Sequence, residues 1–280
     1  MDTETLIPDA ILHRKGARKI DDIPPKVASL LNEGKLESVN LTEWLAVDHK
    51  SLLHAVTAEM SLGQDAESLL LRINAFSERK IMKLIPAIAE EWLVWLEGRC
   101  AAERSGLYEA LAGHRSDSVR CWAAYMIGLD ARLSLEQKLA GIRPFAADQH
   151  FGVREIAWMA VREPIIRELR EALVYFAGWV IDADANIRRF AIEATRPVGV
   201  WAKHIVALKE EPAPALPLLE AVCSDPAKYV QDSVSNWLND AGKTNPDWVL
   251  QVCNRWQEQS DTKQTKRIVT RAKRNLLKES

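Results

Sequence analysis

A hydrophobic residue followed by one or two polar, mostly charged residues recurs along the chain. The hydrophobic anchors are Val119, Val153, Ile187 and Val230, at intervals of 34, 34 and 43 residues. A repeat of this length is typical of stacked helix pairs, in which neighbouring pairs bury their apolar faces and the array leaves a long concave surface. We therefore expect an all-α solenoid whose function lies on the concave face.

The register after each anchor predicts which side chains are buried. Positions 0, 3, 4 and 7 form an apolar stripe at helical spacing, and in the second repeat these positions are Val153, Ile156, Ala157 and Ala160. Positions 2 and 6 lie one turn apart on a different face, because each residue advances by about 100°. In the last three repeats they are Glu155 and Met159, Arg189 and Glu193, and Asp232 and Asn236. These charges form either a functional surface or an ordinary solvated face.

The N-terminal hundred residues lack this period and read as several short helices. Pro24 and Pro25 predict the start of one helix, and a tryptophan-bearing helix is expected over residues 85–96. We interpret residues 1–100 as an N-terminal helical cap region and residues 101–280 as the repeat array, the two forming one continuous superhelical domain.

Composition limits the class of protein. The chain has 280 residues, of which 48% are hydrophobic and 27% charged, so it is too apolar to be disordered. No apolar run approaches the roughly twenty residues that span a bilayer, and the N-terminus lacks the basic and apolar regions of a signal peptide. We expect a cytoplasmic protein without a membrane partner, and, as for other capped arrays, a monomer.

Motifs for metal, nucleotide or serine chemistry are missing from the sequence. The four cysteines are scattered without a CxxC pair, which favours buried, reduced thiols, and the six histidines show no ligand spacing. There is no glycine-rich phosphate loop, no GxSxG elbow and no kinase motif. We expect no metal and no cofactor.

The C-terminal segment is basic although the whole chain has a net charge of −2. Residues 251–280 hold eight basic side chains against three acidic ones. A basic helix is an electrostatic footprint for phosphates, or it is a solvated capping helix that keeps the end of the array soluble. Arginines that follow the anchors extend the positive charge inward along the repeats: Arg120, Arg154, Arg188 and Arg189.

Two long motifs carry a family resemblance. Residues 186–197, NIRRFAIEATRP, followed by Trp201 and Ala202, closely resemble a motif of the AlkC branch of the bacterial DNA alkylation repair glycosylases. Residues 229–240, YVQDSVSNWLND, resemble a second AlkC motif, and the KTNP within residues 242–249 is also similar to the sister AlkD branch. The likeness extends from about Leu133 to the C-terminus, a little over half of the chain.

The resemblance implies a superhelix of HEAT-like repeats whose concave face holds double-stranded DNA. It also implies an activity, the removal of cationic methylated purines such as 3-methyladenine by hydrolysis of the N-glycosidic bond. Most glycosylases extrude the base into a pocket, but this family is described as acting without flipping the base. No cofactor is implied, because water is the only co-substrate.

Hydrolysis of the N-glycosidic bond gives an independent reason to expect a carboxylate on the DNA-facing surface. A cationic base leaves behind an oxocarbenium-like sugar, which a nearby carboxylate stabilises, and the same group positions the attacking water. By resemblance, Glu155 falls where AlkD-type enzymes have their catalytic aspartate, and Glu193 falls on the acidic position of the AlkC motif. We expect Glu155 first and Glu193 second to be catalytic.

The resemblance and the charge pattern together give the other candidate site residues. Arg189 matches an arginine beside the lesion phosphate, and Asn236 stands where AlkD-type enzymes have a DNA-contacting tryptophan. Phe151 and Trp158 are the candidate lesion-proximal aromatics. The candidate DNA-binding residues are Arg120, Arg154, Arg188, Arg189, Arg196, Trp201, Asn236, Lys266, Arg267, Arg271 and Arg274.

An alternative from another functional class stays open. Members of this superfamily include proteins that keep the fold without excising bases. The chain would then be a non-catalytic HEAT-repeat scaffold that binds DNA or a protein through the concave face. The two readings differ in whether Glu155 and Glu193 support turnover.

Overall fold

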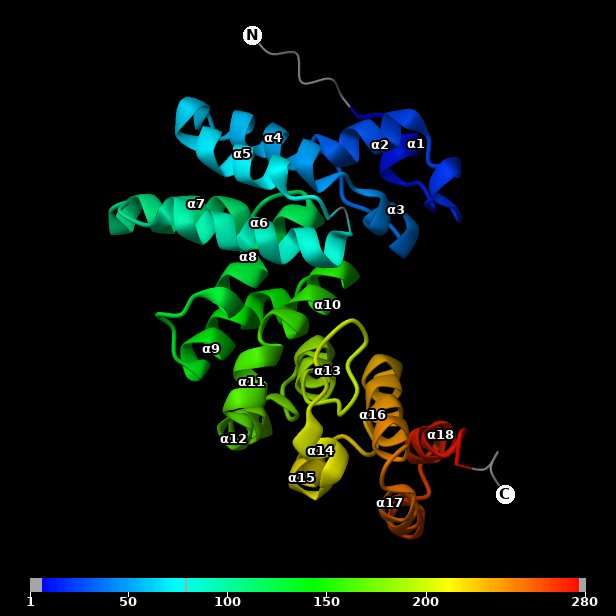
Figure 1. Ribbon diagram of the computed structural model, residues 1–280. Coiled ribbons are helices and arrows are strands. Elements are labelled where there is room, and N and C mark those ends of the chain that lie inside the picture. The colour runs from blue at the N-terminus through cyan, green and yellow to red at the C-terminus, as the bar shows by residue number, and fades with distance from the viewer. Residues whose placement is uncertain (1–6, 79, 277–280) are drawn as a thin grey trace. The chain divides into compact units, whose positions relative to one another are not determined.

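The computed structural model describes residues 7–78 and 80–276, and within these ranges it contains helices and no strand (Figure 1). The chain divides into two compact units. The first unit comprises Met1–Asp130 and His150–Ile156, and the second comprises Ala131–Gln149 and Ala157–Ser280. The predicted all-α class is confirmed.

The first unit holds the N-terminal helices. They are α1 (Asp9–Leu12), η1 (Ile20–Asp22), α2 (Pro25–Asn32), α3 (Leu41–Ala46), α4 (His49–Glu59), η2 (Gly63–Ala66), α5 (Glu67–Ala75), α6 (Ile81–Leu96), α7 (Ala101–Ala112) and α8 (Asp117–Leu129). The division between the units falls inside α10 (Phe151–Ala160).

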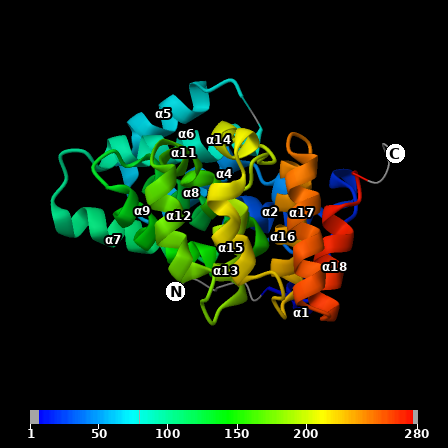
Figure 2. The same cartoon turned by 90° about the horizontal axis from the view of Figure 1, so that it is seen from below.

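The second unit holds the remaining helices. They are α9 (Leu135–Ala146), α11 (Arg162–Arg167), α12 (Leu169–Trp179), α13 (Ala185–Ala194), α14 (Val206–Glu210), η3 (Ala213–Ala215), α15 (Leu216–Ala221), α16 (Lys228–Ala241), α17 (Pro246–Gln259) and α18 (Lys263–Ala272). Its C-terminal helices α16, α17 and α18 lie side by side (Figure 2).

The four anchors occupy the same place in four helices. Each helix begins two residues before its anchor, at Asp117, Phe151, Ala185 and Lys228. The stripe is buried at every position, including its one polar member, Ser233. The predicted helical register and core stripe are therefore confirmed in all four repeats.

The arginine that follows the anchor supports the chain turn before its helix in the repeats of Val119 and Ile187. Arg188 Nη1 donates to the carbonyls of Asp182 and Ala183 at 2.8 and 3.0 Å. Arg120 Nη1 makes the equivalent bonds, at 2.8 Å to His114 and at 3.2 Å to Arg115. Turn carbonyls of this kind need a donor when water is excluded, so this recurring polar position has a structural use.

Two sequence expectations need correction. The tryptophan-bearing helix begins at Ile81 rather than at residue 85 and runs through Pro86. Burial of Ile81, Leu84 and Ile85 compensates for the hydrogen bond that proline cannot donate. The cysteines are not all buried, since Cys100 is exposed and Cys223 is half-buried.

Candidate active site and nucleic-acid interface

Helices α13 and α16 of the second unit bring two buried carboxylates to one arginine. Arg196, just after α13, donates from Nη1 to Glu193 Oε2 at 3.0 Å. It also donates from Nε and Nη2 to Asp240 Oδ2 at 2.9 and 2.7 Å. Glu193 and Asp240 are 4% and 5% exposed. We call Arg189, Glu193, Arg196, Ser233 and Asp240 the carboxylate cluster.

Glu193 has partners on both oxygens. Ser233 Oγ donates to Glu193 Oε1 at 2.7 Å, and Arg189 Nη2 lies 3.8 Å from the same oxygen. Burial alone would raise the pKa of Glu193, but the charges of Arg189 and Arg196 and the hydrogen bond from Ser233 outweigh it. The pKa of Glu193 therefore lies below its ordinary value of 4.5, and the group is ionised at neutral pH.

Burial separates this cluster from an ordinary solvated helix face. Arg189 is 6% exposed, and its guanidinium carbon lies 4.5 Å from the centre of the Tyr229 ring. Charged groups are placed inside a protein only where they are paired or have a use, because desolvation is costly. The reading of Arg189 and Glu193 as a solvated face is therefore wrong.

Asp240, which belongs to the cluster, was missed from the sequence. It lies ten residues after the anchor Val230, on the helix face of Asp232 and Asn236 and one turn beyond Asn236. Extending the series of positions 2 and 6 by one further turn would have found it.

Residues 195–205 form the loop between α13 and α14. This loop contains Arg196 of the cluster and also Trp201. Trp201 has a positive φ of 57° and is 60% exposed. All ten tryptophans lie among the described residues, and Trp201 alone is classed as exposed. An L residue in the left-handed region costs free energy, so this loop holds a large aromatic side chain outward at some expense in stability.

Arg162, the first residue of α11, lies beneath this loop. It donates to the carbonyls of Ala194 at 2.7 Å and Lys203 at 2.9 Å, and also to that of Arg196. Its side chain is buried, and burial, together with the charge of Arg196, lowers the pKa of Arg162 to about 10. Arg162 therefore remains a cation at neutral pH. No sequence motif singled it out.

Several predicted DNA-binding arginines form ion pairs with acidic side chains of the same chain. Arg188 pairs with Asp225, with Nε 2.6 Å from Oδ2, and Arg120 Nη2 lies 2.6 Å from Glu37 Oε1. Arg154 is half-buried on α10. Phosphate contact by Arg120 or Arg188 would have to share these guanidinium groups with existing acceptors.

The predicted basic surface lies on α18 and the residues that directly follow it. Arg267 and Arg271 both approach Asp232, at 2.7 and 3.2 Å. Arg274 donates to Asn236 at 3.0 Å, which joins two of the predicted residues. Lys266 pairs with Asp261 and is mostly exposed. Lys278, one of the eight basic side chains counted at the C-terminus, lies outside the described residues.

The predicted catalytic Glu155 and the predicted aromatics lie on α10. Glu155 and Phe151 are half-buried, and both belong to the first unit. Phe151 packs edge-on against Trp44, with ring centroids 6.2 Å apart. Trp158, in the second unit, is 2% exposed, and Arg162 lies 6.0 Å from its ring centre. Both aromatics therefore have packing roles within their own units.

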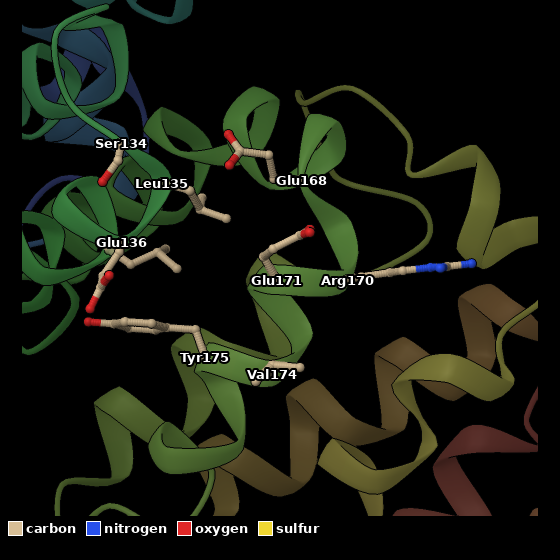
Figure 3. A pocket seen from close by; sticks show the side chains of 9 residues that line it. Ser134, Leu135, Glu136, Glu168, Arg170, Glu171, Val174 and Tyr175 are labelled. Carbon is tan, nitrogen blue, oxygen red and sulfur yellow. The ribbon is translucent and has the colours of Figure 1, made fainter.

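A groove of 580 Å³ in the second unit contains none of the predicted site residues (Figure 3). Its lining includes the apolar residues Leu135, Leu139, Val174 and Tyr175 and the acids Glu136, Glu168 and Glu171. In Figure 3 the side chain of Arg170 runs away from the other labelled side chains. Carboxylates repel phosphates, so this groove is unsuited to the DNA backbone.

The described residues include neither a cluster fit for a metal ion nor a helix fit to cross a membrane. No group of three or more histidine, cysteine, aspartate or glutamate side chains there is arranged to hold a metal ion. Among the same residues, no helix combines the length and the apolarity needed to cross a bilayer.

Sequence comparison identifies relatives of the segment that holds the cluster. Residues 155–272 match a family described as DNA alkylation repair enzyme. The uncharacterized protein YhaZ of Bacillus subtilis (strain 168) is 36% identical over 119 residues, which are 42% of this chain and 33% of that protein. The chain thus spans about a third of the length of this relative.

Solved structures share the fold. Pseudomonas fluorescens alkylpurine DNA glycosylase AlkC, bound to DNA containing an abasic site analog, aligns with a TM-score of 0.67 and 22% identity. That alignment covers 81% of this chain and 62% of AlkC. AlkD2 from Streptococcus mutans aligns with a TM-score of 0.58 and 20% identity over 76% of this chain and 99% of AlkD2.

The fold and the cluster define an all-helical repeat protein with buried carboxylates and arginines in its C-terminal unit. The predicted HEAT-like repeat class is confirmed by the structural relatives. Residues 155–272 of the chain thus match the DNA alkylation repair enzyme family, and the chain shares its fold with AlkC and AlkD2.

Proposed function

We propose that this protein is a DNA glycosylase that hydrolyses the N-glycosidic bond of cationic methylated purines, of the 3-methyladenine type, in duplex DNA. The observation that carries the proposal is the pair of buried carboxylates, Glu193 and Asp240, joined by Arg196 within the segment that matches the repair family. The chain covers only 62% of AlkC, so AlkC's activity supports the proposal and does not establish it.

The reaction needs little acid catalysis. Methylation makes the base cationic, so the bond between C1′ and the ring nitrogen breaks with its electron pair going to the base. The sugar acquires oxocarbenium character, and water then adds to C1′ and loses a proton. A carboxylate held near C1′ opposes the developing positive charge, and in a partly desolvated site such a contact contributes on the order of several kcal/mol.

The cluster suits this task because Glu193 is ionised before the reaction begins. The lowered pKa of Glu193 keeps it anionic at neutral pH. Arg196, bound to both acids, fixes their orientation, and preorganised charge avoids a reorganisation cost during the reaction. Glu155, on α10, remains in the proposal as a further catalytic carboxylate on the resemblance to AlkD-type enzymes.

DNA contact is assigned to the positive and aromatic groups of the second unit. Lys266 and Arg271 on α18, and Arg274 just after it, are exposed cations suited to phosphate contact. Trp201 offers an exposed ring that is suited to stacking or to insertion beside a base or sugar. That AlkC was solved bound to DNA containing an abasic site analog supports duplex DNA as the partner.

The test is release of methylated bases from alkylated duplex DNA, with the products identified by chromatography. We expect 3-methyladenine release by the wild-type protein and loss of release in Glu193→Gln or Glu155→Gln with duplex binding retained. Glu258→Gln, an exposed acid on α17, is the matched control and should release bases at the wild-type rate. The variant that loses release identifies the catalytic carboxylate.

A non-catalytic scaffold is the alternative outcome of the same test. Folded wild-type protein that binds duplex DNA and releases no base would support a DNA-binding scaffold. Protein that neither binds DNA nor releases bases would support a protein-binding one.

A further inference from the structure

Trp201 is held at the surface by a loop with a tightly closed base. Ile205 N donates to Pro197 O at 3.1 Å, which joins the two ends of the loop. A Cβ added at Gly199 would lie 3.1 Å from Ala202 Cβ and 3.4 Å from Arg162 Nη2. The loop therefore folds closely over the Arg162 guanidinium.

Arg162 binds three main-chain carbonyls, one at the end of α13 and two within the loop. Its Nη1 binds the carbonyl of Ala194, the last residue of α13, its Nη2 binds that of Arg196, and its Nε binds that of Lys203, on the far side of Trp201. One planar group thus joins the two arms of the loop that carries Trp201. Lys203 Nζ also lies 3.0 Å from Glu163 Oε1, next to Arg162 in sequence.

These contacts satisfy groups that would otherwise lack donors. The last carbonyls of a helix have no partner within the helix, and the negative end of the helix dipole favours a cation. Trp237 Nε1 donates a hydrogen bond to Thr195 O at 3.0 Å. Arg162 donates to the carbonyls of the residues before and after Thr195. Arginine presents several donors in a rigid fork, whereas lysine offers one compact charge, so the three-point contact needs arginine.

The same side chain also lies close to the carboxylate cluster. The charges of Arg196, Glu193 and Asp240 all act on the Arg162 guanidinium. The base of the Trp201 loop and the cluster are therefore parts of one packed arrangement in the second unit.

We propose that Arg162 is a positioning residue that fixes the Trp201 ring against duplex DNA. It acts through the loop and itself touches no DNA. The proposal rests on the DNA-binding function proposed above, and it adds a residue that neither the sequence motifs nor the predicted contacts include.

The test is a double-mutant cycle on duplex affinity with Arg162→Lys, Trp201→Ala and the combination. We expect Arg162→Lys to weaken binding by about tenfold, similar to the loss of one aromatic stacking contact. In the Trp201→Ala background, Arg162→Lys should have little further effect, because the ring that it positions is gone. A purely structural role would instead lower affinity by the same factor in both backgrounds, which would overturn the proposal.

A control variant and a folding check distinguish a specific loss of DNA affinity from unfolding. Arg14→Lys is the control, because Arg14 likewise donates to main-chain carbonyls, those of Ile11 and Glu37, but belongs to the first unit. It should leave duplex affinity unchanged at matched thermal stability. Circular dichroism and thermal melts establish that each variant is folded.

Iodide quenching of Trp201 fluorescence separates failure of this proposal from failure of the proposed function. The Trp201 signal is the difference between each protein and its Trp201→Phe counterpart. If wild-type protein does not bind DNA, the proposed function fails, and quenching alone decides the positioning role. A quenching constant altered by Arg162→Lys would support the role, and an unaltered constant would overturn it.

Discussion

Arg196 donates two hydrogen bonds to a single oxygen of Asp240, from Nε at 2.9 Å and from Nη2 at 2.7 Å. The remaining terminal nitrogen of the same guanidinium binds Glu193 at 3.0 Å. Two acids far apart in the sequence are thereby held at fixed orientation in a buried site. Lys243 adds a contact to the other oxygen of Asp240 at 3.0 Å.

Asp240→Asn should slow base release. The substitution removes a negative charge beside Arg196 and Glu193 and keeps the shape of the side chain, so we expect the single-turnover rate to fall on the order of 100-fold. Asp247→Asn, an exposed aspartate on α17, is the matched control. Equal rates for the two variants, both folded, would remove Asp240 from the catalytic site.

Glu193 should make folding stability depend on pH in the acidic range. Its pKa is lower in the folded protein than the ordinary value of 4.5. The stabilisation is therefore fully present above 4.5 and is lost as the pH falls through the folded-state pKa. Urea unfolding between about pH 6 and pH 3 should show wild type losing its advantage over Glu193→Gln as the pH falls. A stability difference that stays constant over this range would contradict the assignment.

Substitutions at Trp201 should separate stability from DNA binding. Trp201→Gly and Trp201→Ala both remove the ring and should weaken duplex affinity alike, by about tenfold. Because φ is 57° at this residue, the glycine variant should be more stable than the alanine variant by about 1 kcal/mol.

Ser61 provides the matched control for the backbone effect, with φ of 56° in the first unit. Ser61→Gly should likewise be more stable than Ser61→Ala in thermal melts, with duplex affinity unchanged. If Trp201→Gly kept wild-type affinity, Trp201 would have no part in binding DNA.

The basic surface formed by α18 and the residues just after it should control the salt dependence of DNA binding. Each phosphate contact contributes about 0.9 to the slope of log affinity against log salt concentration. Replacing Lys266 and Arg274 by Gln should therefore make the slope shallower by up to about 2. Arg170→Gln, an exposed arginine on α12, should leave the slope unchanged. An unaltered slope in the double variant would favour the reading of α18 as a solvated capping helix.

The sequence was sufficient to predict the repeat and its buried stripe. The spacing of Val119, Val153, Ile187 and Val230 reflects local helical geometry, and each helix begins two residues before its anchor. Local patterns are set by residues close in the chain, so one sequence contains them. The motif that includes Glu193 likewise lay on the predicted helix.

The contacts that build the site depend on which helices pack together. That Arg196 bridges Glu193 to Asp240 is not apparent in the sequence, because this contact requires α13 to lie against α16. The arginines after the anchors are predicted DNA contacts, and the sequence does not show that Arg188 also reaches carbonyls five and six residues before it. The left-handed backbone of Trp201 also has no signal in its residue type, since tryptophan rarely adopts it.

Single-turnover release of 3-methyladenine from a methylated duplex, with protein in excess over DNA, tests the central claim most directly. The account predicts first-order release by the wild-type protein well above the spontaneous rate, with one abasic site formed for each base released. Glu193→Gln should slow that release on the order of 100-fold while binding the duplex as tightly as wild type. Folded wild-type protein that binds the methylated duplex and releases base no faster than buffer would contradict the account.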